Sequence, residues 1–298
     1  MPGPAAPEPE ETDVSEIRQP VPDEVGIADS NGVRIGWRRY GDGPRSILFI
    51  PTWNFVDSRV LRHQVEGLRD RFRLLTFDAR GSGSSGHPRD GYQFDDHVAD
   101  AMAVLDASQT AAASIVAGSL GTHVAVLLAT RHPDRVARMV LIAPPMSVGG
   151  TDDGGVEAPT ESSDDDGSAR SSAPDWRTDY PAFVRWFIGE VFSEPDSQAT
   201  IDEVVGIALE ADHAMLLQQS AELDWNEAPH HLKDVRCPTL IIHGAADRTL
   251  ELASIKAVAA GIPGARLVLL DDLGHRPDIR RPDIVNPILA GFLGDDEA

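Results

Sequence analysis

The alternation of apolar and polar positions divides the chain into short strand-like runs and longer helix-like stretches. The runs Ser46–Ile50, Ala113–Ala117 and Val136–Ile142 are almost wholly apolar, as expected for strands that are covered on both faces. Between the runs, apolar residues recur with the period of an amphipathic helix. This order predicts a mostly parallel twisted sheet flanked by helices, which is the α/β class. The predicted strands are Val25–Asp29, Val33–Tyr40, Ser46–Ile50, Phe72–Phe77, Ala113–Ala117, Val136–Ile142, Thr239–His243 and Ala265–Leu270.

No strand pattern occurs between Ile142 and Thr239, where the apolar residues follow the helical period. This stretch predicts a helical insertion in the sheet domain. We therefore expect a core formed by residues 23–146 and 236–298, and a cap formed by residues 147–235. The predicted helices of the cap are Asp179–Phe192, Asp202–Asp212 and Ala214–Leu223, and those of the core are Arg59–Leu68, Phe94–Leu105, Leu120–Arg131, Leu250–Ala260 and Pro282–Leu293.

The acidic residues are unevenly distributed, which limits what the net charge of −22 can mean. Residues 1–24 and 151–173 each carry seven acidic side chains against one arginine, so these two segments hold more than half of the excess negative charge. Their composition predicts a disordered acidic tail over 1–22 and an acidic low-complexity loop over 147–173. A chain of this charge is not expected to bind nucleic acid.

Cysteine usage and hydropathy indicate the compartment. The single cysteine, Cys237, excludes an internal disulfide framework and fits a reducing environment. The first residues lack the basic and apolar regions of a signal peptide, and no apolar run approaches the ~18 residues of a membrane span. We therefore expect a soluble cytoplasmic protein that does not bind membranes.

Ser119 stands between a strand-like run and a helix-like stretch and is flanked by small residues. A serine at such a tight turn forms a nucleophile elbow, which leaves no room for large neighbouring side chains. Ala117, Gly118 and Gly121 meet this requirement. The turn places the hydroxyl at a helix N-terminus, so the backbone N–H of Leu120 can point at a developing oxyanion. A Ser/Gly-rich loop that opens a helix is the structural alternative.

A serine nucleophile needs a histidine as general base and a carboxylate that orients the histidine. Asp247 and His275 each follow a predicted strand, where the loops of an α/β sheet carry active-site groups. The chain order Ser119, Asp247, His275 is the order of the α/β-hydrolase triad. A helix N-cap is the structural alternative for Asp247, and Asp271 and Asp272 are alternative acids.

Together these motifs resemble those of an α/β-hydrolase-fold protein of the large lidded serine-hydrolase family. The resemblance covers residues 25–293 and implies a second oxyanion N–H from Trp53, in the loop after the strand that ends at Ile50. The residues that carry it, in the family's order, are Asp78-Ala79-Arg80-Gly81-Ser82-Gly83-Ser84-Ser85, the elbow at Ser119, Ile241-Ile242-His243-Gly244-Ala245-Ala246-Asp247-Arg248, and Gly274-His275.

Two positions depart from the family pattern. Many relatives have His-Gly where this chain has Pro51-Thr52, which puts the geometry of the second oxyanion donor in question. Ala117 stands where the elbow usually has glycine, which adds one methyl group. The nucleophile is serine rather than aspartate, which argues against the alkyl-enzyme chemistry of haloalkane dehalogenases and epoxide hydrolases.

Other motifs carry less chemistry. The glycines of Gly81–Gly86 match G-x-G-x-x-G, but turn residues follow them instead of a helix, so dinucleotide binding is not expected. His230 and His231 lie side by side without the pattern of a metal site, and no metal is expected. Aromatic residues at helical spacing in the cap predict a buried stripe or a pocket wall. The candidate pocket residues are Asn54, Phe55, Phe183, Trp186 and Phe187.

The sequence predicts a serine hydrolase that cleaves a carboxylic ester or thioester of a small to medium, apolar substrate through an acyl-enzyme, without a cofactor. Lactone opening, C–C bond hydrolysis and perhydrolysis would use the same triad. Because of Pro51-Thr52, a ligand-binding receptor with little turnover is the alternative. A third hypothesis is an interaction module whose acidic loop Thr151–Ala173 recruits a basic partner; no other protein partner is indicated.

Overall fold

A single eight-stranded sheet organises residues 18–148 and 174–294, which are the residues that this computed structural model describes. Its strand order is β1-β2-β4-β3-β5-β6-β7-β8. The pairs β1–β2 and β2–β4 are antiparallel, and all other pairs are parallel. This sheet confirms the predicted α/β-hydrolase fold class. The strands are β1 (Glu24–Ser30), β2 (Val33–Tyr40), β3 (Ser46–Ile50), β4 (Arg73–Phe77), β5 (Ala113–Gly118), β6 (Val136–Ile142), β7 (Thr239–Gly244) and β8 (Arg266–Leu270).

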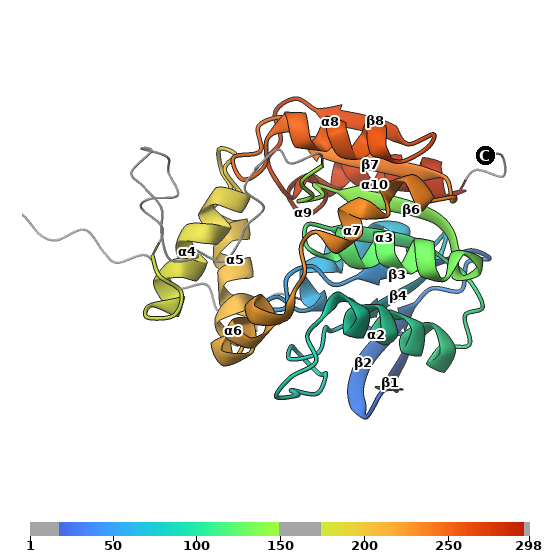
Figure 1. Ribbon diagram of the computed structural model, residues 1–298, viewed down its shortest axis with the longest axis horizontal. Coiled ribbons are helices and arrows are strands. Elements are labelled where there is room, and N and C mark those ends of the chain that lie inside the picture. Colours follow the sequence, from blue (N-terminus) through green and yellow to red (C-terminus); the bar gives the residue numbers. More distant parts are fainter. Residues whose placement is uncertain (1–17, 149–173, 295–298) are drawn as a thin grey trace, which may run out of the picture.

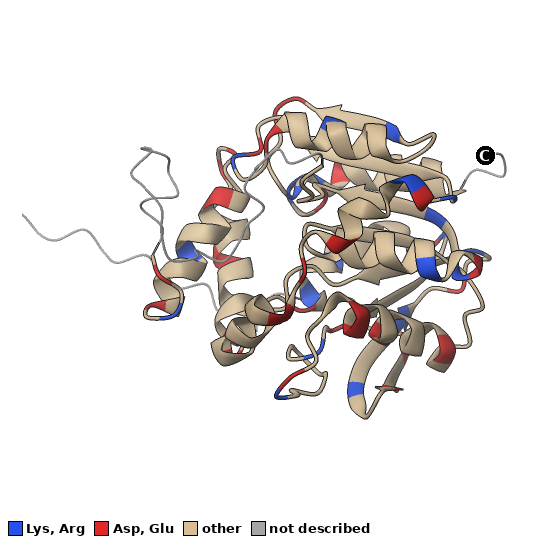
Figure 2. Cartoon of the chain, viewed as in Figure 1, with Lys and Arg blue, Asp and Glu red and all other residues tan. Residues whose placement is uncertain are grey.

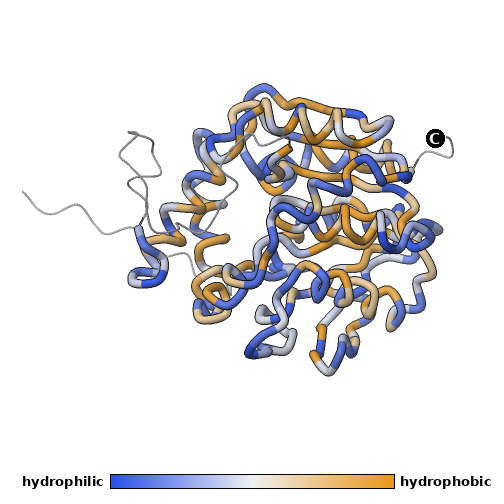
Figure 3. Tube along the Cα trace, viewed as in Figure 1, coloured by the Kyte–Doolittle hydropathy of each residue, from blue (hydrophilic) through white to orange (hydrophobic). Residues whose placement is uncertain are grey.

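Each face of the sheet packs against its own helices because successive side chains of a strand point to opposite faces. In β3, Ile47 and Phe49 belong to one apolar cluster, whereas Leu48 and Ile50 belong to the other. The strands are among the most hydrophobic segments of the chain (Figure 3). The first cluster is covered by α1 (Arg62–Leu68) and α10 (Pro282–Gly294), and the second by α2 (Phe94–Ala107), α3 (Gly121–Arg131) and α8 (Leu252–Gly261).

Three helices between β6 and β7 lie together to one side of the sheet (Figure 1). They are α4 (Tyr180–Val191), α5 (Gln198–Leu209) and α6 (His213–Glu222). No strand occurs among the described residues of this insertion, as the sequence predicts. The following helix α7 (Glu227–His230) instead contacts α3, and Ala228 joins the second cluster. Most of the predicted acidic tail 1–22 and of the predicted acidic loop 147–173 lies outside the described residues.

The element boundaries follow local capping. The predicted helix Arg59–Leu68 begins as a short 3-10 turn, η2 (Ser58–Leu61), because the carboxylate of Asp57 accepts the N–H of Arg59 and fixes the first turn. A turn at Asn31-Gly32 joins β1 to β2, with left-handed φ angles of 53° and 87°. A single helical turn, α9 (Pro277–Arg280), is an addition to the predicted elements.

Charged residues fall mainly in the helices and loops (Figure 2). No helix in the described part of the chain combines the length and the hydropathy that a membrane span requires.

Asp78 directly follows β4 and connects three segments that are distant in the chain. Its buried carboxylate accepts hydrogen bonds from Arg38 of β2, from Ser58 and from Ser84. Burial by itself would raise the pKa of Asp78, but the charge of Arg38 and the serine hydrogen bonds hold this pKa below its ordinary value. The carboxylate therefore stabilises the folded state when it is ionised.

We predict that Asp78→Asn lowers the free energy of unfolding by about 2 kcal/mol at pH 7, because Arg38 loses the charge of its buried partner. Because the folded-state pKa is depressed, the wild-type advantage is complete above about pH 4 and shrinks as the pH falls. Urea unfolding between pH 2 and 8 measures it. Asp42→Asn, at a carboxylate that is 87% exposed, is the matched control and should change stability by less than about 0.5 kcal/mol. Equal losses in both variants would contradict the role of the buried carboxylate.

Candidate active site

Ser119 occupies the tight turn between β5 and α3 in a left-handed backbone conformation, with φ of 51°. Its N–H donates to the carbonyl of Ile142 in the neighbouring strand at 2.9 Å. The hydroxyl of Thr122 donates to the carbonyl of Ser119 at 2.6 Å. A left-handed non-glycine residue costs about 1–2 kcal/mol, and a nucleophile elbow stores this kind of strain. The two hydrogen bonds hold Ser119 in the strained conformation.

The small residues around Ser119 permit two close approaches. A Cβ atom on Gly121 would lie 2.4 Å from the carbonyl oxygen of Pro51, and one on Gly118 would lie 3.0 Å from Cζ of Arg276. Glycine is therefore needed at position 121 for the loop after β3 to reach the elbow, whereas a side chain at position 118 would press against the guanidinium of Arg276. The methyl group of Ala117 is buried in the second apolar cluster, so the sheet accommodates this departure from glycine.

The structure brings Ser119, His275 and Asp247 together from three distant parts of the chain. Nε2 of His275 lies 3.0 Å from Oγ of Ser119, and Nδ1 lies 2.8 Å from Oδ2 of Asp247. His275 is 3% exposed, and the side chain of Asp247 is 1% exposed. We call these three residues the Ser119–His275–Asp247 array. The alternative acids Asp271 and Asp272 are exposed and outside the array.

Thr249 settles the tautomer of His275, although the sequence analysis did not single it out. The hydroxyl of Thr249 donates its proton to Oδ1 of Asp247 at 2.8 Å. The hydroxyl oxygen of Thr249 can therefore only accept a hydrogen bond from Nδ1 of His275, which lies 2.9 Å away. Both neighbours of Nδ1 are therefore acceptors, and the proton sits on Nδ1. Nε2 is left as the acceptor for the hydroxyl of Ser119. The only sequence signal for this role was the position of Thr249 two residues after Asp247.

Asp247 is held as a carboxylate inside the protein. Burial would raise the pKa of Asp247, but the charge of His275 and hydrogen bonds from His275 and Thr249 lower it to about 2. The N–H groups of Thr249 and Leu250 also donate to Oδ1 of Asp247. A second histidine, His243, lies 3.8 Å from Oδ2, beyond hydrogen-bond distance, and burial lowers its pKa to about 4. Asp247 is thus ionised beside two imidazoles: that of His243, which is buried and neutral, and that of His275, which Asp247 orients.

The two predicted oxyanion donors flank the elbow. Leu120 is the N-cap residue of α3, where backbone N–H groups have no acceptor within the helix. Trp53 lines the same cavity as Ser119, and its N–H has no acceptor among the described residues. Pro51 and Thr52, the departure from the family pattern, lie against α3 through the close approach to Gly121. The loop therefore reaches the elbow despite its changed sequence.

A narrow apolar cavity of about 40 Å3 opens beside Ser119 and His275. Two of the candidate pocket residues, Phe55 and Phe187, line it. Phe183 and Trp186 instead pack in and against the first apolar cluster, and the amide of Asn54 turns away to donate to the carbonyl of Arg80. The other apolar walls are Trp53, Val56, Val60, Ile188, Val191, Phe192, Val204 and Ile279.

The aromatic spacing singled out helix α4, but of its three candidate aromatic residues only Phe187 faces the cavity. Phe187 is followed at helical spacing by Val191, and both point into the cavity, whereas Phe183 stacks on Phe187 from outside it. Arg276, the residue after His275, also lines the cavity. The sequence analysis missed Arg276 because nothing in the pattern indicated that a charged residue there would be buried.

The inserted helices are tied to the loop that carries His275. A carboxylate oxygen of Glu194, after α4, accepts the N–H of Gly274 at 2.7 Å. Arg280 donates to the hydroxyl of Ser197 and to the carbonyl of Pro195, each at 2.9 Å. On the opposite side, Arg62 forms two hydrogen bonds of 2.7 Å with Glu203 of α5.

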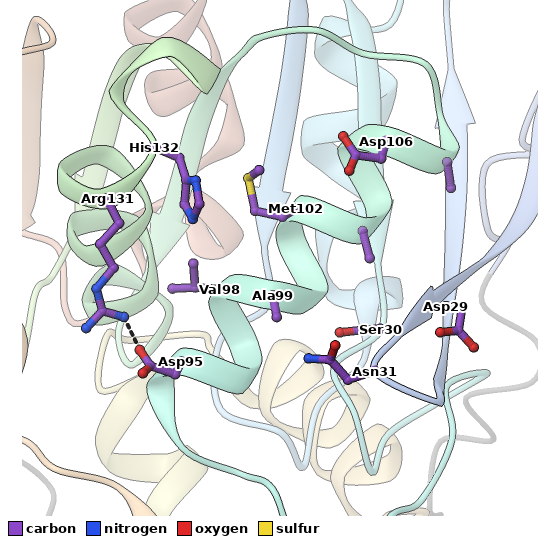
Figure 4. Close-up of a pocket in the computed structure, with 12 residues that line it drawn as sticks. Asp29, Ser30, Asn31, Asp95, Val98, Ala99, Met102, Asp106, Arg131 and His132 are labelled. Atoms are coloured by element: carbon purple, nitrogen blue, oxygen red, sulfur yellow. Dashed lines mark hydrogen bonds and ion pairs between the residues drawn. The ribbon is translucent and has the colours of Figure 1, made fainter.

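A larger hollow lies elsewhere, in an open groove of about 840 Å3 between the β1–β2 turn, α2 and the end of α3 (Figure 4). Asp29, Asp95 and Asp106 lie along it, and Asp95 forms an ion pair with Arg131. No nucleophile with an adjacent base lines this groove among the described residues. It therefore does not compete with Ser119 as the reaction site.

Two further sequence expectations concern cofactors. The segment Gly81–Gly86 closes a turn in which the N–H of Gly81 donates to the carbonyl of Gly86, and the next helix begins only at Phe94. It thus lacks the helix N-terminus that a dinucleotide fingerprint needs. Within residues 18–148 and 174–294, no cluster of three or more potential ligand side chains could hold a metal ion.

Comparison with known proteins agrees with the fold. Residues 46–185 match the family model of the alpha/beta hydrolase fold. The chain is 34% identical to the pimeloyl-[acyl-carrier protein] methyl ester esterase of Aromatoleum aromaticum over 183 residues, which is 57% of this chain and 70% of the relative. It is 30% identical to the 2-hydroxymuconate semialdehyde hydrolase of Pseudomonas sp. (strain CF600) over 269 residues, which is 87% of this chain and 86% of the relative.

Among solved structures, the bromoperoxidase of Bacillus anthracis superposes with a TM-score of 0.78. The alignment covers 91% of this chain and 100% of the bromoperoxidase chain, at 24% identity, so it shows the fold alone. The matches with the two sequence relatives cover more than two thirds of each relative's length at 30% identity or above. With the eight-stranded sheet and the elbow, these matches show that the chain belongs to the α/β-hydrolase-fold family of hydrolases.

Proposed function

We propose that the protein is a serine hydrolase that cleaves a carboxylic ester or thioester of a small to medium, apolar substrate through an acyl-enzyme. The observation that carries this proposal is the continuous line of hydrogen bonds from Asp247 through His275 to Ser119, which ends at the mouth of an apolar cavity. The name of one relative, a methyl ester esterase, supports an ester as the bond that is cleaved.

The first half of the reaction would use the tautomer that Thr249 and Asp247 impose. Nε2 of His275 accepts the proton of Ser119 while Oγ attacks the carbonyl carbon of the ester. The imidazolium that forms is stabilised by the carboxylate of Asp247 2.8 Å away. It then gives its proton to the leaving alcohol or thiol, and the acyl group stays on Ser119.

The developing oxyanion would be stabilised by the N–H groups of Leu120 and Trp53. Such donors typically contribute about 10²–10³ in rate each, because they are fixed before the reaction begins. In the second half, His275 takes a proton from water, which attacks the acyl carbon and releases the acid. These steps need no cofactor.

The inserted helices α4, α5 and α6 would act as a cap that determines which substrate groups enter. Phe187, Ile188 and Val191 of α4 and Val204 of α5 supply much of the cavity wall. Their apolar side chains favour an alkyl or acyl group over a charged one. The single cysteine, Cys237, is free in the described structure, and we propose a reducing cytoplasmic compartment as the place of action.

The array predicts selective covalent labelling of Ser119. A fluorophosphonate probe should modify Ser119 in the wild type, and Ser119→Ala should abolish the labelling, because the hydroxyl of Ser119 both lines the cavity and faces Nε2, the unprotonated nitrogen of His275. Peptide mass spectrometry locates the adduct, and circular dichroism checks that both proteins are folded. Folded wild type that does not react would overturn the hydrolase proposal in favour of a ligand-binding protein.

Asp247→Asn should lower kcat by about 10⁴, because the wrong tautomer of His275 would be favoured. The loss should be constant above about pH 4, since a pKa of about 2 keeps the wild-type carboxylate ionised there. Initial rates on a p-nitrophenyl ester measure it. Asp272→Asn, at an exposed acid in the same region, is the matched control and should keep wild-type activity. A loss of less than tenfold for Asp247→Asn would show that another group orients His275.

The narrow cavity predicts a preference for short chains. In a series of p-nitrophenyl esters, kcat/KM should fall as the acyl chain becomes longer than about four carbons. Val204→Ala enlarges the wall and should shift the optimum toward longer chains, whereas Val205→Ala, at a buried neighbour that does not line the cavity, should not. The same shift in both variants would mean that the cavity beside Ser119 does not hold the acyl chain.

A further inference from the structure

Arg276, which lines the apolar cavity, forms a buried ion pair with Asp278. Nε and Nη2 of Arg276 donate to the two carboxylate oxygens of Asp278 at 2.9 and 2.8 Å. Arg276 is 5% exposed and Asp278 is 2% exposed. Apart from Thr52, Ser119 and His275, every other residue that lines the cavity is apolar. The guanidinium is thus the main polar group in the space that a substrate would enter.

The Ser119–His275–Asp247 array does not use this pair. Among the described residues, neither Arg276 nor the carboxylate of Asp278 forms a hydrogen bond with a member of the array. Burying two charges costs free energy, and a well-packed apolar pair is often as stable. Burial of this ion pair therefore costs free energy that a purely structural role would not require.

One nitrogen of the guanidinium keeps a free donor. Nη1 of Arg276 has no acceptor among the described residues, and it is not one of the fully buried polar atoms that lack a partner. Arg276 lines the cavity, and we infer that Nη1, whose donors no described residue uses, is the atom that a substrate oxygen would reach. Its two N–H bonds can be satisfied there by a bound molecule.

The chain contains a second copy of the same motif, which shows what the motif does on its own. Arg281-Pro282-Asp283 begins α10 as Arg276-Pro277-Asp278 begins α9. Nε and Nη2 of Arg281 donate to Asp283 at the same 2.9 and 2.8 Å, but this pair is exposed to solvent. The motif can therefore start a helix without being buried, so the start of α9 does not explain why Arg276 lines the cavity.

We propose that Arg276 is a specificity-determining residue, an inference that rests on the hydrolase function proposed above. Nη1 donates a hydrogen bond to a neutral acceptor, a keto or ether oxygen, in the part of the ester that enters the cavity. Asp278 cancels the charge of the guanidinium, so a substrate carboxylate gains no net attraction and pays for its desolvation. The preferred substrates are short esters with one uncharged oxygen function a few atoms from the scissile carbonyl.

Matched ester pairs test the preference in the wild type. Ethyl levulinate is compared with ethyl isocaproate for the acyl side, and methoxyethyl acetate with butyl acetate for the alcohol side, each corrected for its rate of hydroxide hydrolysis. One pair should show a kcat/KM about tenfold higher for the oxygen-containing ester, the usual effect of one hydrogen bond to a charged donor. Monoethyl glutarate should be hydrolysed more slowly than the preferred ester. Equal values within both pairs, or a preference for the glutarate, would overturn the proposal.

The variant Arg276→Met/Asp278→Leu removes the pair together, which avoids leaving one buried charge unpaired. In this variant the selectivity within the responding pair should fall to about one. Arg281→Met/Asp283→Leu, the same change in the exposed copy, should keep the tenfold selectivity. Because selectivity is a ratio for one enzyme, a general loss of activity does not change it. An unchanged ratio in the first variant would show that Arg276 does not recognise the substrate.

A binding measurement separates this inference from the hydrolase proposal. Ser119→Ala lacks the nucleophile, so dissociation constants of the same esters can be measured from tryptophan fluorescence, because Trp53 lines the cavity. Tighter binding of the oxygen-containing ester, abolished by the Arg276/Asp278 changes in this background, would support the role of Arg276 even if the wild type proved unable to hydrolyse esters. Hydrolysis in the wild type without this difference would leave the hydrolase proposal standing and reject the role of Arg276.

Discussion

The left-handed conformation of Ser119 is the constraint on which the rest of the site depends. It costs about 1–2 kcal/mol and persists only because β6 accepts its N–H and Thr122 holds its carbonyl. The conformation lifts Oγ out of the sheet, where His275 can reach it from a loop that is 156 residues away in the chain. Glycine is also required at position 121, where the carbonyl of Pro51 approaches the elbow, and Gly118 leaves room for the guanidinium of Arg276. The conformation of one strained residue therefore determines how the loops that carry Pro51, His275 and Arg276 can approach the elbow.

His275 is held from both sides along its own loop, and each side is connected to a different structural unit. Before it, the N–H of Gly274 is bound by Glu194 of the insertion. After it, Arg276 packs over Gly118 of the elbow while it pairs with Asp278. The ring itself is oriented by Asp247 and Thr249. A shift of the insertion would therefore act on the backbone next to the base, which gives the inserted helices a physical route to influence the array.

The fold could be predicted from the sequence because strand periodicity is a local pattern. The small residues of the elbow and the chain order also singled out three residues that the structure brings within hydrogen-bond distance of one another. Of the candidate pocket residues, Phe55 and Phe187 line the cavity, whereas the amide of Asn54 turns toward Arg80. Side-chain direction in a loop depends on partners that lie far away in the sequence. The two Arg-Pro-Asp motifs illustrate why burial could not be predicted from local sequence. Their sequences and local geometries agree, but tertiary packing buries only one of them.

The buried pair also resolves an electrostatic conflict beside the base. A donor strong enough to recognise a substrate oxygen in an apolar cavity is most easily an arginine. A lone positive charge next to His275 would, however, oppose the imidazolium that the proposed reaction forms when His275 takes the proton of Ser119. Asp278 removes this conflict because it cancels the charge locally and still leaves Nη1 free to donate. The guanidinium then behaves as a fixed dipole rather than as an ion. A polar recognition group can thus stand one residue from the base at little electrostatic cost to the proton transfer.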